Sequence, residues 1–547
     1  MFKFLAAVPQ LWLRVLIEVG ISFAAVFLVR LLSRKIRFRH ALGHLPGPEP
    51  PSWLWGSEWD VYVSEPGKIY LDWAEKYGRV YKFRGALRSM MLTITDPRAV
   101  SYVLGAEHAY DYPKPKGARA WFKLLVIKSP LYKLGEGVLY AEGEEHAHHR
   151  RTLSPAFNLQ ATRNLCSIFV DCASKAVEKW TEELDKSPEA SLEFDVQYWA
   201  NRISLDTFGL AGFSHDFDTL SNKKPTGLAA VLDSLTDSNA SFSSFVLHAL
   251  LFTFPSILKA PGRRRKMLGR AREAMSEITT RVWANAKQRG EDDGGKTILE
   301  ILVDADSENE LTEDAIAAEM MTLIFAGYET TSCVISWTLH ELSLDPSLQA
   351  RLREEVSANP SDPSFDDLYE DDKLPLLDAV VQETIRLHPP ILELHRVAAQ
   401  SGTIPLSTPL PGTPGQPASD RLFVPRGTLI AIPLNVMQRE KSVWGDDADK
   451  FRPERWIEYN NQREREKASG KTHLGAERRL MAFSEGKRVC IGKTFALVEI
   501  KAVLVILLRH FTFTKARDIE DFVSFVVRPR VKGEKKSTLP IRVGKVV

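Results

Sequence analysis

The ten residues FSEGKRVCIG (483–492) restrict what this chain can fold into more than any other stretch. Cys490 follows Arg488 by two residues and lies between Gly486 and Gly492, and Phe483 opens the stretch. Five specified positions at fixed spacing occur by chance on the order of 10⁻⁴ per chain of this length. A functional loop is therefore a better interpretation than a surface turn or an ordinary small buried cysteine.

The residue types in this loop suit a cysteine thiolate. Gly486 and Gly492 would let backbone amides point at the sulfur, because glycine tolerates positive φ and allows a flat ligand to approach the backbone. Arg488 is placed to meet a carboxylate, and Phe483 to shield the sulfur from water. We expect these neighbours to keep Cys490 anionic and protected.

Composition makes the rest of the chain an ordinary globular protein. Of its 547 residues, 44% are hydrophobic and 26% are charged, and the formal net charge of +2 gives no global field that would attract nucleic acid. Four cysteines are too few for a disulfide scaffold, so we expect free thiols and a reducing compartment.

The expected fold class is mainly α with a small β subdomain, because helical patterns dominate and β-type runs are short. The Pro- and Gly-rich segment 403–420 is expected to be an irregular surface excursion. The apolar segment 245–258 is expected either to dip into a membrane surface or to cover the core. The expected helices include 159–184, 271–288, 312–344, 374–387 and 495–508, and the expected strands include 80–83, 91–94 and 428–433.

The N-terminus departs from this average. Residues 15–29 are apolar except for Glu18, Gly20 and Ser22, and a collar of five basic residues follows between 30 and 39. The pattern predicts a membrane anchor helix with the body on the cytoplasmic side; a buried amphipathic helix is the alternative. We therefore divide the chain into an anchor and collar at 1–40, a proline-rich hinge at 41–56 and a catalytic domain at 57–547.

Three further stretches carry unusual polar residues. FAGYETT (325–331) places Glu329 in an apolar helical run, where an acid is costly unless it is paired or used. Gly327 in the same stretch is expected to let the helix open locally. QETIRLHPP (382–390) has an acid and an arginine at the i,i+3 spacing of helical ion pairs. GEEHAHHRR (143–151) has three histidines but lacks the i,i+4 pair typical of a helical zinc site.

These stretches resemble the motifs of the cytochrome P450 superfamily. FSEGKRVCIGKTFA (483–496) is similar to its haem-binding loop, and FAGYETT to its oxygen-binding helix. QETIR and FRPERW (451–456) are similar to its structural Glu–Arg–Arg triad, here Glu383, Arg386 and Arg455. The resemblance runs from about residue 45 to the end and implies the cytochrome P450 fold.

The resemblance implies haem b as the cofactor and Cys490 as the axial ligand of its iron. It makes Glu329 a proton relay and Thr330 the hydroxyl nearest the oxygen, whereas the triad would lock the scaffold without a catalytic role. His146 stands where most members have tryptophan. The residues expected to contact haem are Cys490, Phe483, Gly486, Arg488, Gly492, Arg150, His146 and Arg396.

The implied activity is that of a haem-thiolate monooxygenase acting on an apolar small molecule. A terpenoid or other secondary-metabolite intermediate is preferred over a fatty acid or a xenobiotic as substrate. A reductase-independent haem-thiolate isomerase or dehydratase and a haem sensor are the rivals from other classes, and the acid–alcohol pair argues against both. Pocket walls are expected at Trp121, Phe122, Leu124, Leu125, Met321, Phe325, Ile391, Leu392, Leu394 and Phe525.

The implied electron donor is a separate NADPH-cytochrome P450 reductase, with cytochrome b5 as an optional second donor, because the chain leaves no room for a flavin domain. Lys487, Lys493, Arg150 and Arg151 would attract an acidic partner surface, with an ordinary solvated rim as the alternative. The other expected partners are membrane lipid and the apolar substrate. The expected location is the endoplasmic reticulum membrane, single-pass, with the catalytic domain cytoplasmic.

Overall fold

The computed structural model describes residues 36–119, 137–221, 241–254, 298–307, 313–412, 417–468, 480–523 and 526–546. The expected anchor at 15–29 and the expected helix at 271–288 lie outside these ranges, as do Trp121, Phe122, Leu124, Leu125 and Phe525. Within the described part of the chain, no helix is both long and apolar enough to cross a membrane.

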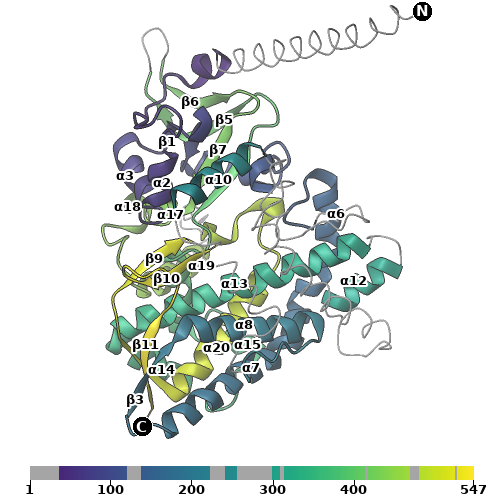
Figure 1. Ribbon diagram of the computed structural model, residues 1–547, viewed down its shortest axis with the longest axis vertical. Helices are drawn as coiled ribbons and strands as arrows, with labels where there is room; N and C mark the ends of the chain where they lie inside the picture. Colours follow the sequence, from purple (N-terminus) through teal and green to yellow (C-terminus); the bar gives the residue numbers. More distant parts are fainter. Residues whose placement is uncertain are drawn as a thin grey trace, which may run out of the picture.

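Helices form most of the molecule, and the long helix α13 runs through its middle (Figure 1). The helices are α2 (Glu58–Val63), α3 (Lys68–Tyr77), α4 (Pro97–Leu104), α6 (Gly143–Leu153), α7 (Leu159–Asp185), α8 (Val196–Phe213), α10 (Phe242–Thr253), α12 (Ile298–Ser307), α13 (Glu313–Leu344), α14 (Pro346–Ser357), α15 (Phe365–Tyr369), α16 (Pro375–Leu387), α17 (Leu434–Met437), α18 (Lys441–Trp444), α19 (Glu454–Ala468) and α20 (Lys493–His510), with 3₁₀ turns η1 (Ala86–Arg88), η2 (Ser154–Phe157), η5 (Met481–Phe483) and η6 (Gly486–Arg488).

The main core forms where α13 packs against α8 and α20, and α20 against α7. Helix α20 is apolar on nearly all sides, which is typical of a helix that neighbours surround completely. Phe495 on α20 lies with its ring centroid 4.9 Å from Phe169 on α7 and 5.6 Å from Phe208 on α8. These edge-on aromatic contacts fix the helix that directly follows the Cys490 loop.

The strands form four small sheets. In the largest, with order β1-β2-β7-β4, the pair β2–β7 is parallel and the other pairs are antiparallel. The strands are β1 (Val80–Arg84), β2 (Met90–Ile94), β3 (Ser191–Asp195), β4 (Glu393–Val397), β5 (Gly402–Leu410), β6 (Ser419–Val424), β7 (Leu429–Pro433), β8 (Phe511–Lys515), β9 (Ile519–Val523), β10 (Val527–Val531) and β11 (Pro540–Lys545).

The expected helices and strands that fall on described residues are present, with bounds that differ by one or two residues at most ends. The interpretation of 403–420 as an irregular excursion is wrong, because β5 and β6 form an antiparallel pair over much of it. Ile404 and Leu406 of β5 are fully buried and alternate with more exposed residues. Leu422 and Val424 of β6 are at most 2% exposed. This period-2 alternation is the strand signal that the prolines and glycines concealed.

Candidate active site

The Cys490 loop is a tight structure built on η5 and η6. The backbone N–H of Cys490 donates to the carbonyl of Phe483 over 2.8 Å, which closes the loop. Gly486 has φ +67°, and a Cβ at this position would lie 2.3 Å from the carbonyl oxygen of Leu104. Only glycine fits there, as expected. Of the four cysteines, all with free thiols, Cys490 is exposed and the other three are buried.

Two expectations about this loop need correction. Gly492 has φ −89°, so it does not need glycine for a left-handed backbone; it instead caps the start of α20. Although the residue as a whole is exposed, the packing around its sulfur raises the pKa of the Cys490 thiol, and the Gly492 amide, Arg150 and Lys493 oppose this rise without cancelling it. The loop alone therefore does not keep the sulfur anionic, and a metal cation at the sulfur would supply the missing stabilisation.

A cluster of cations surrounds the loop. Arg488 forms an ion pair with Glu142 through Nη2, and its Nε donates to the Ala109 carbonyl. Its third nitrogen, Nη1, is buried and has no hydrogen-bond partner among the residues that the structure describes. Lys114 lies 3.6 Å from the same Glu142 carboxylate and donates to the Leu139 carbonyl. Arg396 of β4 is buried and donates to the carbonyl of His395.

Electrostatics show that this cluster has more positive charge than its own anions balance. Burial lowers the pKa of Lys114 to about 7, with smaller contributions from the nearby Arg488 and Arg396. The Glu142 carboxylate opposes this shift but does not cancel it. Burial and Arg488 lower the pKa of Arg396 to about 10. Buried cations that repel one another are stable only beside further negative charge, so the cluster is suited to binding an anionic group.

Helix α6 brings two of the predicted haem contacts to this cluster. Arg150 donates from Nη1 to the carbonyl of Val489, the residue before Cys490, over 2.7 Å. His146 is buried, and its Nδ1 lies 3.2 Å from the hydroxyl of Tyr110. Burial, with Arg488 next, lowers the pKa of His146 to about 3, so the imidazole is neutral near pH 7 and can donate only one hydrogen bond.

The acid–alcohol pair lies on α13. Thr330 is partly exposed and its Oγ1 donates to the carbonyl of Ala326 over 2.7 Å. Glu329 is fully buried and forms a two-point ion pair with Arg528 of β10, in which Arg528 Nε donates to Oε1 over 2.8 Å. The acid is therefore paired, and this long-range partner was missed by the sequence analysis.

Gly327 was expected to open the helix locally, and it does not. Helix α13 continues through this residue without interruption. A Cβ at Gly327 would lie 2.4 Å from the ring of Phe208 on α8. The glycine is needed because α8 packs closely against α13 at this point.

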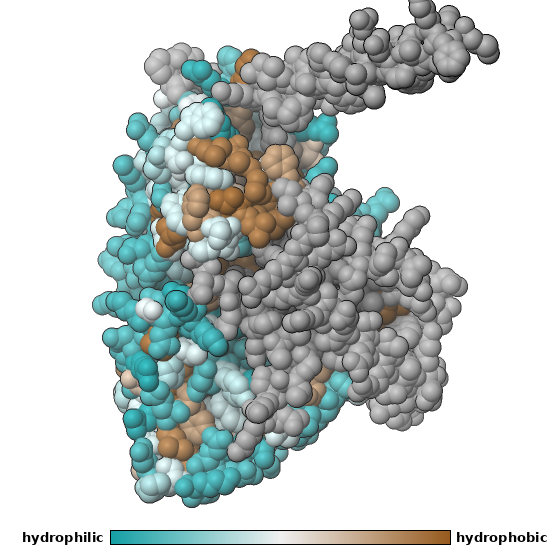
Figure 2. Space-filling model, viewed as in Figure 1, coloured by the Kyte–Doolittle hydropathy of each residue, from teal (hydrophilic) through white to brown (hydrophobic). Residues whose placement is uncertain are grey.

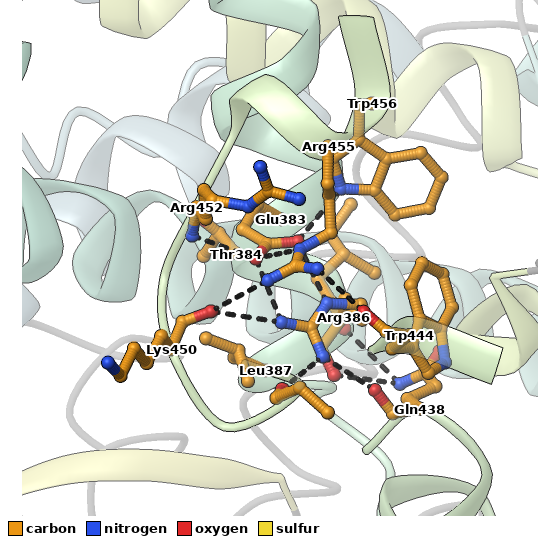
Figure 3. A network of polar contacts seen from close by, with 12 residues as sticks. Glu383, Thr384, Arg386, Leu387, Gln438, Trp444, Lys450, Arg452, Arg455 and Trp456 are labelled. Carbon is orange, nitrogen blue, oxygen red and sulfur yellow. Dashed lines mark hydrogen bonds and ion pairs between the residues drawn. The ribbon is translucent and has the colours of Figure 1, made fainter. Parts of the chain in front are cut away.

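The Glu–Arg–Arg triad is confirmed, and Figure 3 shows its network of polar contacts. Glu383 accepts from Arg386 through both oxygens at 2.8 Å and from Arg455 Nε at 2.9 Å. Trp456 Nε1 and the Arg452 backbone N–H donate to the same carboxylate. Both oxygens of the Glu383 carboxylate thus accept several hydrogen bonds from these neighbours, which supports a structural role for the triad.

Sequence reasoning also missed two acids that lie close to the site. Glu319 on α13 and Glu499 on α20 are fully buried. Each stands in an apolar helical run, the same signal that singled out Glu329, so the signal was present in the sequence. Lys114 and Glu142 were missed because isolated charges in loops carry no periodic signal.

Comparison with known proteins gives one consistent family. The family model "Cytochrome P450" matches residues 46–536. Cytochrome P450 monooxygenase claP from Ampulloclitocybe clavipes is 36% identical, over 97% of this chain and 99% of the relative. Its paralogue claQ is 37% identical, over 92% and 93%. Cytochrome P450 monooxygenase 205 from Postia placenta is 33% identical, over 95% and 96%.

The residues at the site fit the haem that this family uses. An exposed cysteine lies in a densely packed loop. Beside it, one guanidinium nitrogen of Arg488 is buried with no partner among the described residues, and the cations Arg488, Lys114 and Arg396 share the carboxylate of Glu142. These features match a thiolate ligand for iron and cations for two propionates. The chain therefore belongs to the cytochrome P450 family and is a haem-thiolate monooxygenase that takes electrons from a redox partner.

Proposed function

We propose that Cys490 supplies the axial thiolate and that Arg488, Arg396 and Lys114 hold the haem propionates, with His146 and Arg150 beside them. The observation that carries this proposal is the excess of buried cations next to the exposed cysteine. When bound, the haem supplies reductive activation of O2. The chain's own residues bind it, exclude water and provide protons.

We further propose that Glu329 and Thr330 provide the proton path. Thr330 is partly exposed on a helix face that also carries the partly exposed Ala326 one turn earlier, which places its hydroxyl at an accessible position. Glu329 is the neighbouring acid, and it forms a buried ion pair with Arg528. The path works only if Glu329 can accept a proton while Arg528 stays beside it.

The substrate proposed is an apolar terpenoid or other secondary-metabolite intermediate. Among the described wall residues, Met321, Ile391, Leu392 and Leu394 are partly exposed, whereas Phe325 is buried. Partly exposed aliphatic side chains suit an apolar guest. The test is spectral: haem-loaded protein is titrated with sesquiterpene and diterpene hydrocarbons, fatty acids and aromatic xenobiotics, and the substrate class is assigned from the spin-state shift. A response to fatty acids or xenobiotics alone would contradict the terpenoid assignment.

We propose NADPH-cytochrome P450 reductase as the donor, with cytochrome b5 as an optional second donor. Lys487, Lys493 and Arg151 are exposed close to the Cys490 loop and would contact an acidic partner surface. Turnover that requires NADPH, reductase and O2 together supports this function. Conversion of a peroxide substrate without reductase would instead support the isomerase alternative.

We also propose attachment to the endoplasmic reticulum membrane through the apolar segment 15–29, with the body on the cytoplasmic side. An apolar patch supports this location: Figure 2 shows it where Figure 1 places α2 and α10. Trp53, Leu54, Val63 and Phe242 are exposed there, and the ring of Phe242 lies 6.0 Å from that of Trp55. A lipid surface is the proposed occupant because the patch is continuous with the chain that follows the apolar segment. Flotation with anionic vesicles, before and after removal of residues 1–40, tests both contributions.

A further inference from the structure

A buried glutamate, Glu319, joins three parts of the chain next to the proposed haem site. Its side chain on α13 is fully buried. Its Oε1 lies 2.6 Å from Nδ1 of His149 on α6 and accepts a hydrogen bond of 2.8 Å from the backbone N–H of Val138. At 2.6 Å the imidazole nitrogen and the carboxylate oxygen are in direct polar contact. This one carboxylate oxygen therefore contacts Val138, in the segment that leads to α6, and also His149 on α6 itself.

The next residue of α6 reaches the cysteine loop. Arg150 follows His149 directly and donates to the carbonyl of Val489, which precedes Cys490. Helix α6 lies alongside one end of α13, close to α12 (Figure 1), and α12 contacts both helices. Helix α6 is therefore tied to α13 at one residue and to the proposed thiolate loop at the next.

The pair is costly to bury, which calls for a reason. His149 and Glu319 are 4% and 0% exposed. Burial raises the pKa of Glu319, and the His149 imidazole and the Val138 amide oppose that rise. The second oxygen, Oε2, is buried, and no described residue forms a hydrogen bond with it. Apolar side chains of similar size would pack here at a lower desolvation cost. What the polar pair provides, and apolar side chains would not, is the directional contacts of the carboxylate.

We propose that Glu319 is a positioning residue for the haem-thiolate site. Its carboxylate holds His149, and because Arg150 follows His149 directly near the end of α6, that contact also positions Arg150 and so the carbonyl beside Cys490. Its hydrogen bond from Val138 fixes the backbone just before Glu142, the carboxylate that pairs with Arg488. The inference rests on the proposed role of Cys490 as the iron ligand.

Three variants of the full-length, haem-loaded protein separate these contacts. Glu319→Gln keeps an amide oxygen for the Val138 N–H but removes the charge that faces His149. His149→Gln removes the same ion pair from the other side. Glu341→Gln is the matched control, since Glu341 also lies on α13 and pairs with a histidine, His388, at 2.7 Å, and both side chains are mostly buried.

The readouts are the carbon monoxide spectrum of the reduced protein, the rate of haem transfer to an excess of a haem-scavenging protein, and the melting temperature. We expect Glu319→Gln and His149→Gln to release haem about tenfold faster than the parent, as loss of one charged contact implies, and to lose the thiolate band on standing. Glu341→Gln should lower the melting temperature to a similar extent but keep the parent's haem release and thiolate band.

Two results would overturn the positioning role. One is haem release and a thiolate band in Glu319→Gln that match those of Glu341→Gln. The other is a normal site in His149→Gln, and this variant decides the question if Glu319→Gln does not fold. A parent protein with no thiolate band would overturn the proposed role of Cys490 and this inference together, whereas a parent with the band and unchanged variants would overturn only the inference.

Discussion

Arg528 binds Glu329 at two points, with Nε 2.8 Å from Oε1 and Nη2 in contact with Oε2, and both side chains are buried. Two other residues of α13 hold the same strand, because Cys333 Sγ and Trp337 Nε1 each lie 2.9 Å from the carbonyl of Val527. The proposed relay acid is therefore also an anchor between α13 and β10. Stability and proton transfer should both depend on this pair.

Arg528→Gln should destabilise the protein by roughly 3–5 kcal/mol, because it leaves the Glu329 carboxylate buried without its counter-charge. Arg530→Gln is a matched control on the same strand, where the partly exposed pair with Glu520 should contribute about 1 kcal/mol or less. Thermal unfolding of the two variants gives the comparison. Equal losses of stability in the two variants would show that the buried pair stabilises the protein no more than the partly exposed pair does.

Thr330→Ala should uncouple NADPH use from product formation, with hydrogen peroxide formed in place of product, because it removes the proposed hydroxyl of the proton path. Thr338→Ala is the control: Thr338 is two turns further along α13 and makes the same type of bond, from Oγ1 to the Val334 carbonyl at 2.8 Å. Peroxide and product are measured per NADPH consumed. Unchanged coupling in Thr330→Ala would remove this residue from the path.

Glu383→Gln should cost about 3–5 kcal/mol of stability, because Arg386 and Arg455 would share a neutral amide in place of a buried carboxylate. Glu454→Gln, which breaks an exposed ion pair with Arg351, should cost about 1 kcal/mol or less. The carbon monoxide spectrum of the folded fraction should be normal in both variants. A selective loss of the thiolate band in Glu383→Gln would show that the triad acts directly on the haem site.

Glu499 should make stability depend on pH. Burial raises its pKa to about 8 although the hydroxyls of Ser204 and Thr331 oppose the rise, and within the described part of the chain neither carboxylate oxygen accepts a hydrogen bond of normal geometry. The folded protein therefore keeps a proton that the unfolded chain releases near pH 4. This contribution to stability is greatest below that pH and is lost as pH rises towards about 8, by at most about 1.4 kcal/mol per pH unit.

The measurement is the melting temperature of Glu499→Gln and of the parent between about pH 5 and pH 8. The variant keeps a neutral side chain of the same shape, so its advantage over the parent should grow with pH. Parallel curves would mean that the Glu499 carboxyl ionises at its ordinary pKa despite its burial.

Local spacing explains what the sequence could predict. The Cys490 loop and the pair Glu383–Arg386 depend on residues within ten positions of one another, and the long apolar helices carry their own period. Gly486 was predicted correctly because its constraint, a positive φ, belongs to the residue itself.

Contacts between distant segments were not predictable in this way. Arg528 is 199 positions from Glu329, and nothing near either residue indicates the other. Gly327 was misread for a related reason: the close approach of Phe208 comes from another helix, so the residue's own neighbours suggested a local opening instead. The β5–β6 pair was missed because prolines in a strand that pairs along one side imitate a loop.

The most direct test of the account is the carbon monoxide difference spectrum of the reduced protein beside that of Cys490→Ala. We predict a strongly red-shifted Soret band in the parent that is absent from the variant, because only Cys490 is placed to supply the thiolate. A parent that is folded and loaded with haem but lacks this band, or a variant that keeps it, would contradict the assignment of Cys490 as the ligand.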